Sequence, residues 1–514
     1  MPPSYPPDSP ILQNFSFDYN VGSQTDAMLP GLESRPIIDY FRYSHNQPYS
    51  FFHEETFRRK VANGTMLDNL LQAVIASSLR FSTDPYFEDN LFFTNKRKVT
   101  ADIFANNSWR ILSSRFVDGD DDCNVGVVQA VTLLAIYEFV EGRQRKAWVK
   151  IGIAAKFAQD LRLMFEPASS LAFSEQEESR RAFWSIYLLD KLMTCGRARP
   201  PVFTDGNVLV QIPCTEIAFL QNQWEETDEV EAYLTNRVPQ CSEPSPVSRV
   251  IIISAILSRC SQYAIQARRN SHALPPWDVS SQYASINSSL IYLESHVNWH
   301  QPVREITSSF KNAMDPGLSS VEQVVVSQAL HHLCYCILNH YFLLRQMMSD
   351  TTTRLPVSFV TNALQSGLYH AKEFNRVLKS ALEAGCKTVS SFLSYACLFC
   401  ATIHAVYRHS DNRAVRDQVF KDLKFALSFL QRQARYWPNS ATMILQLDDF
   451  CQHALVYKPL IDDSYEGINI SAVDTNRIYT LIDYSILSSR KDIAIWTSNS
   501  PEDPLWLSKI TEAC

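Results

Sequence analysis

Apolar residues recur every three or four positions along most of this chain, a spacing that places them on one face of an α-helix. The clearest run lies within 146–165, where six apolar side chains share a face: Trp148, Ile151, Ala155, Ala158, Leu161 and Phe165. The same spacing predicts further helices over 66–82, 86–116, 125–140, 247–270, 279–298, 318–349, 357–383, 388–409 and 412–434. No alternation of strands with helices accompanies it, so we expect an all-α fold, an irregular array of many helices.

Two sequence signals predict where neighbouring helices meet. Pro167 is expected to end the helix over 146–165, because proline cannot continue a helix. Ser174 followed by Glu177 has the spacing of a capping box. This pair therefore predicts the start of the next helix, over about 175–195.

Other segments lack the helical pattern. Residues 1–35 are rich in proline, serine, aspartate and asparagine, which predicts a disordered tail. Residues 37–60 favour an aromatic-rich, extended passage, and the acidic, proline-containing stretch 215–248 is typical of a surface loop. Beyond 440 the pattern weakens into short helices and loops. These changes divide the chain into a tail, a first helical domain and a C-terminal helical region packed on it, over 1–35, 36–270 and 271–514.

Composition narrows the classes of function. Only 13 of the 514 residues are glycine, so glycine-rich phosphate-binding loops are not expected, and none of their motifs occurs. The net charge of -7 disfavours direct DNA binding by the bulk of the chain, because domains that bind DNA alone are usually basic. No secretory signal and no apolar stretch of membrane-spanning length is apparent, so we expect an intracellular protein with no membrane partner.

Residue groups that look like metal or catalytic sites are each better explained by ordinary structure. Asp118, Asp120 and Asp122 lack the glycine and the final carboxylate of a calcium loop. Cys397 and Cys400 form a C-x-x-C without a second pair, inside an apolar helical run, which favours core packing. His331, His332 and His340 on one helix are expected to be partly buried or surface histidines, and the basic trio Lys96, Arg97 and Lys98 is expected to lie on a solvated helix face. We therefore expect no enzyme, no cofactor and no metal-ligating residue.

One passage is recognisable. Residues 180–191 read RRAFWSIYLLDK and run on to 196–201, GRARPP, where glycine and two prolines close the helix. This passage resembles the signature of the fungal-specific transcription factor domain, the middle homology region of zinc binuclear cluster regulators. The preceding helix (147–163) and the opening segment (37–57) resemble the family's corresponding passages in the same order. The resemblance implies an all-helical regulatory domain over 36–270, with these structural signature residues: Arg181, Trp184, Asp190, Gly196, Arg197, Arg199, Pro200 and Pro201.

Asp190 is the one signature residue whose burial demands a partner. It stands in an otherwise apolar stretch of the helix, and a buried carboxylate needs a compensating group. Arg197 or Arg199, on the turn after Gly196, is the expected ion-pair partner. We expect such a pair to pin the turn to the helix.

The family's DNA-reading module is the point where this sequence departs from the pattern. That module needs six closely spaced cysteines ahead of the regulatory domain, and the first cysteine here is Cys123. We expect the zinc cluster to lie outside this chain, whether it was lost from the gene, left out of the sequence or supplied by another chain. DNA contact is then expected only indirectly or through that module.

The resemblance implies a nuclear regulator of a fungal metabolic gene set, for example a secondary-metabolite biosynthetic cluster. Its expected partners are a co-regulator, a paralogue or a second copy of itself, together with a small-molecule effector held between helices. The alternative is a non-transcriptional interaction or scaffold protein that kept the fold and lost DNA binding. A helical enzyme such as a terpene-type cyclase would need a second carboxylate motif beside Asp448-Asp449, and the sequence supplies none.

Overall fold

The computed structural model describes residues 34–84, 87, 96–119, 121–196, 199–235, 243–265, 274–299, 301, 303–308, 317–348, 356–462 and 470–489. Within these ranges the regular elements are helices, and the β-type pairing is one isolated bridge between Gln211 and Glu229. The all-α prediction is therefore confirmed. The predicted tail lies outside the described residues except at its last two positions, where the first helix begins.

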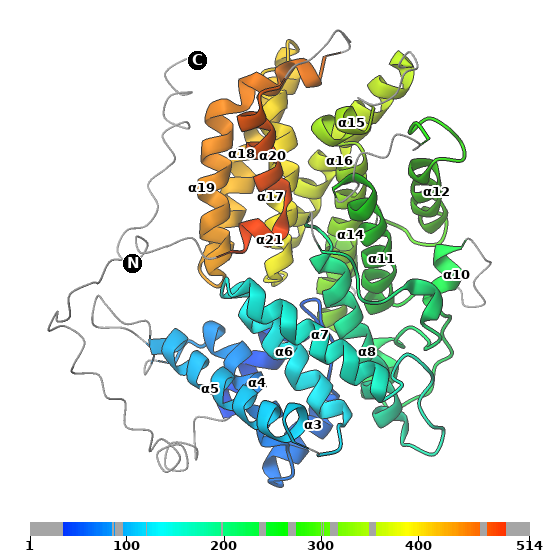
Figure 1. Ribbon diagram of the computed structural model, residues 1–514, viewed down its shortest axis with the longest axis vertical. Helices are drawn as coiled ribbons and strands as arrows, with labels where there is room; N and C mark the ends of the chain where they lie inside the picture. The colour runs from blue at the N-terminus through cyan, green and yellow to red at the C-terminus, as the bar shows by residue number, and fades with distance from the viewer. Residues whose placement is uncertain are drawn as a thin grey trace, which may run out of the picture.

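The first group of helices encloses α6, which is apolar on every side. A helix with apolar residues all round must be covered on all faces, and α4, α5, α7 and α8 cover this one. Figure 1 shows the group in blue and cyan at the lower left. Its members are α2 (Ser34–Asp39), α3 (Glu54–Ala62), α4 (Asp68–Ser78), α5 (Lys96–Leu112), α6 (Val125–Val140) and α7 (Gln144–Asp160).

The middle of the chain forms a second group around α14, which packs between α11 and α16. Helix α8 joins the two groups, because it contacts α6 and α7 on one side and α11 on the other (Figure 1). The helices here are α8 (Phe173–Met193), α9 (Glu216–Leu220), α10 (Val230–Leu234), α11 (Pro246–Ala264), α12 (Gln282–Glu294), α13 (Val303–Ser308), α14 (Gly317–Leu338), α15 (Tyr341–Met348) and α16 (Val357–Glu383).

The last group surrounds α17, nearly all of whose side chains are buried. α18 and α19 pack on it side by side (Figure 1), and α20 lies against both α17 and α19. The chain then returns to the first half, because the backbone N–H of Tyr484 donates to the carbonyl of Cys195 at 2.8 Å. The helices are α17 (Ser391–Tyr407), α18 (Arg413–Ala434), α19 (Pro438–His453), α20 (Ala472–Ile482) and α21 (Tyr484–Leu487).

Short 3-10 and π turns extend several of these helices. In the described residues, one π segment follows α2 and another follows α5. One 3-10 segment follows α4, one precedes α9 and one follows α19. They are η2 (Tyr40–Ser44), η5 (Ser113–Val117), η3 (Leu79–Phe81), η6 (Asp205–Asn207) and η7 (Ala454–Leu460).

Several predicted boundaries are wrong, each for a local reason. Helix α7 ends at Asp160 rather than near Pro167, because Arg162 takes a left-handed φ of 56° and Leu163 N–H donates to the carbonyl of Ala158 at 2.9 Å. The helix predicted over 318–349 is two helices, α14 and α15, with a break at 339–340. Beyond 440, where short elements were expected, α19 runs for 16 residues.

The break between α14 and α15 coincides with a close approach of α16. A Cβ on Gly367 of α16 would lie 2.7 Å from the backbone oxygen of Asn339. Glycine is therefore required here for the two backbones to meet. The close contact depends on how the helices pack, which the apolar spacing of the sequence does not predict.

The predicted surface loop over 215–248 is also wrong in its described part. It contains the short helices α9 and α10, and Phe219, Val230 and Tyr233 are buried. One of its carboxylates, that of Glu216, is also buried. The predicted extended passage over 37–60 likewise includes the second half of α2, all of η2 and most of α3.

Glu322 on α14 ties the opening segment to the turn before α17. Its carboxylate accepts a hydrogen bond from the backbone N–H of Lys387 at 3.0 Å and a second from the side chain of Gln47. Gln47 also donates to the carbonyl of Lys387 at 2.8 Å. Burial raises the pKa of Glu322 to about 7, and the Lys387 ammonium offsets this only in part.

Glu322→Gln should reduce the loss of stability that the wild type suffers on going from pH 5 to pH 8. A raised native pKa stabilises the fold fully below the usual value of 4.5, and this contribution disappears as pH rises through about 7. We expect the wild type to lose about 1–2 kcal/mol more than the variant over this interval. Denaturant unfolding at both pH values measures it, with Glu55→Gln on the exposed face of α3 as control. Equal pH dependence in wild type and both variants would contradict the prediction.

Candidate functional site

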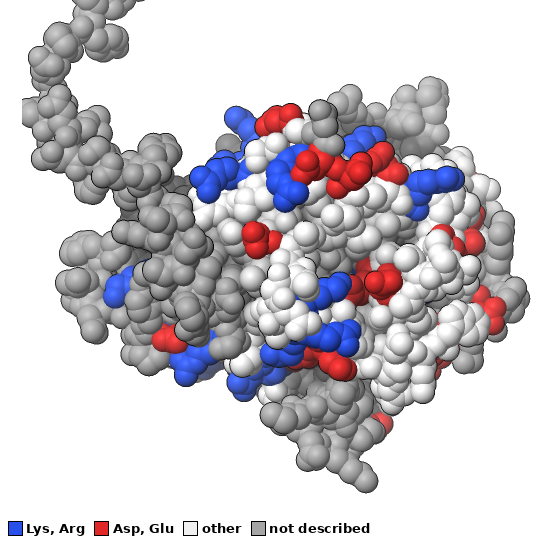
Figure 2. Space-filling view, turned by 90° about the horizontal axis from the view of Figure 1, so that it is seen from below, with Lys and Arg blue, Asp and Glu red and all other residues white. Residues whose placement is uncertain are grey.

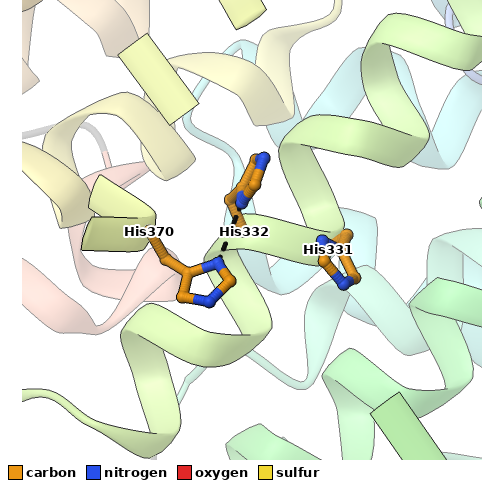
Figure 3. A group of neighbouring side chains, drawn as sticks. All are labelled: His331, His332 and His370. Carbon is orange, nitrogen blue, oxygen red and sulfur yellow. Dashed lines mark hydrogen bonds between the residues drawn. The ribbon is translucent and has the colours of Figure 1, made fainter. Parts of the chain in front are cut away.

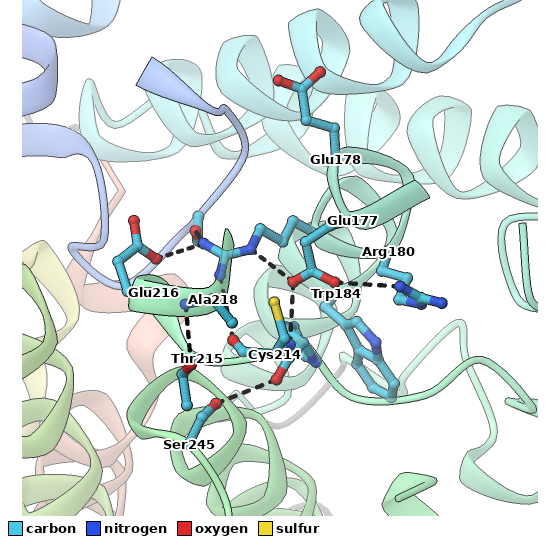
Figure 4. Close-up of polar contacts among 12 residues, drawn as sticks. Glu177, Glu178, Arg180, Trp184, Cys214, Thr215, Glu216, Ala218 and Ser245 are labelled. Carbon is cyan, nitrogen blue, oxygen red and sulfur yellow. Dashed lines mark hydrogen bonds and ion pairs between the residues drawn. The ribbon is translucent and has the colours of Figure 1, made fainter. Parts of the chain in front are cut away.

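Arg181 on α8 lies at the centre of a buried polar network. Its guanidinium donates to Glu177 at 2.9 Å and to Glu216 at 2.6 Å, and its side chain is 0% exposed. It also donates to the hydroxyl of Ser50 at 2.7 Å and to the carbonyl of Cys214 at 3.3 Å. Figure 4 shows the two carboxylates reaching the guanidinium from opposite sides. One side chain thus joins the opening segment, α8 and the passage 214–216.

The charges of this network compensate one another. Burial alone would raise the pKa of Glu216, but the Arg181 guanidinium and His45 hold it well below its usual range. Burial opposes the charge on Arg181 as well, and Glu216 and Glu177 more than offset that effect and raise its pKa. The guanidinium also lies 4.0 Å from the ring centre of Phe219, a cation–π contact. The ionised state is therefore stable inside the protein.

Glu177 takes part in this network and not in a capping box. Helix α8 begins at Phe173, one residue before the predicted cap, and Ala172 occupies the N-cap position. Glu177 is buried one turn further on, where it binds Arg181 and accepts the backbone N–H of Cys214 at 3.1 Å. The predicted capping box is therefore wrong, since the carboxylate faces inward.

Trp184 attaches the backbone at Gln211 to helix α8. Its indole N–H donates to the carbonyl of Gln211 at 2.7 Å, and the side chain is buried. Beside it, Arg180 donates to the second oxygen of Glu177 at 3.4 Å (Figure 4) and pairs with Glu166 at 2.6 Å. The second oxygen of Glu166 accepts the backbone N–H of Gln211 at 2.7 Å. Both backbone groups of Gln211 are therefore bound. Its carbonyl is bound by Trp184 of α8, and its N–H is bound by Glu166, the partner of Arg180.

Asp190 binds backbone N–H groups and does not pair with Arg199, one of its two predicted partners. Its carboxylate accepts the backbone N–H of Val202 at 2.9 Å and that of Phe203 at 3.1 Å. Arg199 instead places its guanidinium 4.3 Å from the ring centre of Trp148, and Asp190 forms no ion pair with it. Burial raises the pKa of Asp190, and the two backbone bonds offset part of that effect. A carboxylate was correctly expected to need a partner, but the chain supplies backbone donors.

Lys191 completes the attachment of the returning segment. Its ammonium donates to the carbonyl of Phe203 at 2.7 Å and pairs with Asp205 at 2.7 Å. Tyr187, one turn earlier, donates to the same carboxylate at 2.7 Å. Asp190 and Lys191 thus bind the N–H and C=O groups of the extended passage that follows the two prolines.

The turn residues of the signature face the C-terminal helices. A Cβ on Gly196 would lie 2.9 Å from the carboxylate of Asp483, so glycine allows α21 to approach. Pro200 is exposed and Pro201 half-buried in the extended passage. Arg197 lies outside the described residues, so its predicted ion pair with Asp190 stays a prediction.

The structure assigns ordinary packing to most of the groups that resembled metal or catalytic sites. Cys397 and Cys400 are buried in α17, where Cys400 lies 3.8 Å from Cys336, so the core interpretation of the C-x-x-C is confirmed. His340 is buried against Thr402 at 3.1 Å, and burial lowers its pKa to about 3. Asp120 of the calcium-like motif lies outside the described residues.

An aromatic pocket lies between the first and last helical groups. Residues from the opening segment, α4, α6 and the start of α19 line it, including Tyr40, Tyr49, Arg80, Tyr137 and Trp437. Arg80 crosses this junction, because its guanidinium lies 4.6 Å from the ring centre of Trp437 and pairs with Glu141 at 3.5 Å. The cavity encloses about 40 Å³, well below the roughly 300–1,000 Å³ of ordinary ligand pockets, and Arg80 is already paired.

The face of the molecule seen from below carries no broad basic patch in its described part (Figure 2). Figure 2 shows lysine and arginine side chains interspersed with aspartate and glutamate over the face seen from below. In the described part of the chain, no helix combines the length and apolar character that crossing a lipid bilayer requires.

The fold and the site define a class of protein: a helical domain whose signature helix forms internal ion pairs. Within that class, the pattern of the fungal specific transcription factor domain matches residues 37–341, and this chain belongs to that family. The match extends well past the 270 expected for the resemblance, to the first residue of α15.

Curated relatives agree with this family. An uncharacterised transcriptional regulatory protein of Schizosaccharomyces pombe is 22% identical over 85% of this chain and 67% of its own length. The Zn(2)-C6 fungal-type transcription factor FTF1c of Fusarium oxysporum f. sp. lycopersici is 22% identical over 82% of this chain and 45% of its own length. The chain thus spans about two thirds of the first relative and less than half of the second. No solved structure matches it.

Proposed function

We propose that this chain is the regulatory part of a nuclear transcription regulator that controls a fungal metabolic gene set, such as a secondary-metabolite cluster. The observation that carries the proposal is the Arg181 network, which joins two passages that resemble the family, the opening segment and helix α8, to the passage 214–216 in one buried junction. Its charges are satisfied internally, which suits a structural core of a regulatory domain better than a catalytic centre.

The domain would act through protein partners, which are a co-regulator, a paralogue or a second copy of the chain. DNA would be reached indirectly or through a zinc-cluster module outside these residues. A small-molecule effector would need the helical groups to part around the aromatic pocket at Trp437, because that pocket encloses only about 40 Å³. A ligand there would bias how the two groups pack.

Transcript profiles of a strain that lacks the gene test the proposal. Wild-type protein should restore a coherent set of metabolic transcripts, and the same protein fused to a nuclear-export signal should not. Restoration by both forms, or no transcript change in any growth condition, would instead favour a scaffold outside the nucleus and refute the regulator. A variant with Trp224→Ala, at an exposed tryptophan away from the junction, controls for expression level.

A further inference from the structure

Three histidines from two helices meet where α12, α14 and α16 adjoin. His331 and His332 are consecutive on α14, and His370 comes from α16. One ring nitrogen of each lies within 4.8 Å of those of the other two. Figure 3 shows His332 and His370 facing each other across the space between the helices, with His331 beside them. His331 and His332 are adjacent in the sequence. His370 comes 38 residues after His332, and no spacing pattern predicts that the two meet.

The distance between two of the rings suits a shared metal ion. Nδ1 of His332 lies 2.9 Å from Nδ1 of His370. Two nitrogens bound to one zinc ion at ~2.05 Å lie ~3.3 Å apart in tetrahedral geometry, so this pair is within a few tenths of an ångström. A neutral imidazole binds metal through its unprotonated nitrogen, and the ring that donates here needs only the other tautomer.

His331 is oriented by a carboxylate, as metal-binding histidines usually are. Its Nε2 lies 3.1 Å from the carboxylate of Glu294 on α12. A carboxylate only accepts, so this nitrogen carries the proton and the lone pair of a neutral His331 lies on Nδ1. The hydrogen bond holds the pKa of Glu294 below its usual range. Tyr335 donates to the same carboxylate at 2.9 Å and keeps it in place.

Aromatic side chains fix the planes of two of the rings. Trp299 stacks on His331 with ring centres 4.5 Å apart, and Tyr335 stacks on His370 at 4.0 Å. Packing that holds ligand rings in place lowers the entropy lost when a metal binds. Glu294 and Trp299 also line an open surface hollow, so solvent reaches the edge of the cluster.

The geometry points to a divalent transition-metal site in which His331, His332 and His370 supply three imidazole nitrogens to one ion, with water as a further ligand. Imidazole ligands select zinc, copper, nickel or iron over magnesium and calcium, and three histidines with an open position form a well-known zinc set. To complete the set, the ring nitrogen of His331 must move by roughly 1–1.5 Å toward the other two, because tetrahedral ligands lie ~3.3 Å apart.

Such an ion would connect parts of the chain on either side of the end of the family match. Helix α14 lies inside residues 37–341, and α16 lies beyond them. A metal bridging the two would stabilise the packing of the C-terminal helices on the regulatory domain. Its loss would weaken that packing. Zinc would then act as a ligand that stabilises one arrangement of the domain.

Zinc titration of the full chain, stripped with EDTA, tests the site. We expect one equivalent of Zn²⁺ to bind by calorimetry and to raise the melting temperature. His370→Asn, on the less buried of the rings, should weaken this binding at least about tenfold, and Glu294→Gln should weaken it by about tenfold. His453→Asn, a half-exposed histidine on α19, should bind like the wild type.

Cobalt(II) identifies the ligands. Nitrogen ligation predicts visible ligand-field bands that disappear in His370→Asn, while the circular dichroism of the variant confirms that it folds. Zinc affinity unchanged by His370→Asn, no binding by the wild type, or a thiolate-to-cobalt charge-transfer band would overturn the site. In any of those outcomes the cluster is a hydrogen-bonded histidine pair packed beside a third ring.

Discussion

Arg181→Met should destabilise the chain by about 3–5 kcal/mol, because it removes the guanidinium that two buried carboxylates share and leaves only longer contacts, from Arg180 to Glu177 at 3.4 Å and from His45 to Glu216 at 3.5 Å. Glu177 and Glu216 are only 1% and 4% exposed, so water cannot replace the guanidinium. Methionine fills much of the same volume but offers no donor to Ser50 or to the Cys214 carbonyl. Denaturant unfolding at pH 7, followed by circular dichroism, measures the loss.

A matched exposed pair provides the control for this experiment. Arg413 is 87% exposed and lies 3.8 Å from Asp417, so Arg413→Met should cost less than about 0.5 kcal/mol. Removing the two stranded charges should also help, so Glu177→Gln with Glu216→Gln should recover part of the stability lost in Arg181→Met. A loss below about 1 kcal/mol in the single variant would show that the network relaxes or hydrates, and the junction would lose its structural role.

Helices were predictable where one apolar face repeats, because that signal is local. The spacing from Trp148 to Ala158 located α7, but its end depends on Arg162 adopting a left-handed conformation, which the residue type does not announce. The single helix expected over 318–349 breaks where Gly367 of another helix meets Asn339. Such a contact is set by tertiary packing and carries no trace in the periodicity of either helix.

The candidate site was predictable only in part, for the same reason. The signature placed Arg181, Trp184 and Asp190 on one helix, and the structure does bury all three there. The partners of Arg181 lie 131 residues away at Ser50 and 35 away at Glu216, and no spacing rule connects them. Acidic residues after 215 resembled a solvated loop, because a charge turned inward looks the same in sequence as one turned outward.

Asp190→Ala should lower the stability by about 2–3 kcal/mol, since it removes the acceptor of two backbone N–H groups and each unpaired donor costs about 1–3 kcal/mol when buried. Val202 and Phe203 donate to this carboxylate, and Asp190 itself is 1% exposed. The extended passage after the prolines would then lose its backbone N–H contacts with α8 and keep those of Lys191 and Tyr187. Asp190→Asn keeps one acceptor oxygen and should lose less than half as much. Thermal and denaturant unfolding of both variants measure the difference.

A double-mutant cycle with Arg199→Met separates this arrangement from the ion pair that the sequence suggested. Arg199 lies against Trp148 while Asp190 binds backbone, so the two effects should add with a coupling below about 0.5 kcal/mol. A direct ion pair between buried groups would instead couple by about 1–3 kcal/mol. Coupling of that size would mean that the turn after Gly196 closes on Asp190 through Arg199 in solution. Additivity means that the helix holds the returning chain by its backbone, while Arg199 packs on Trp148.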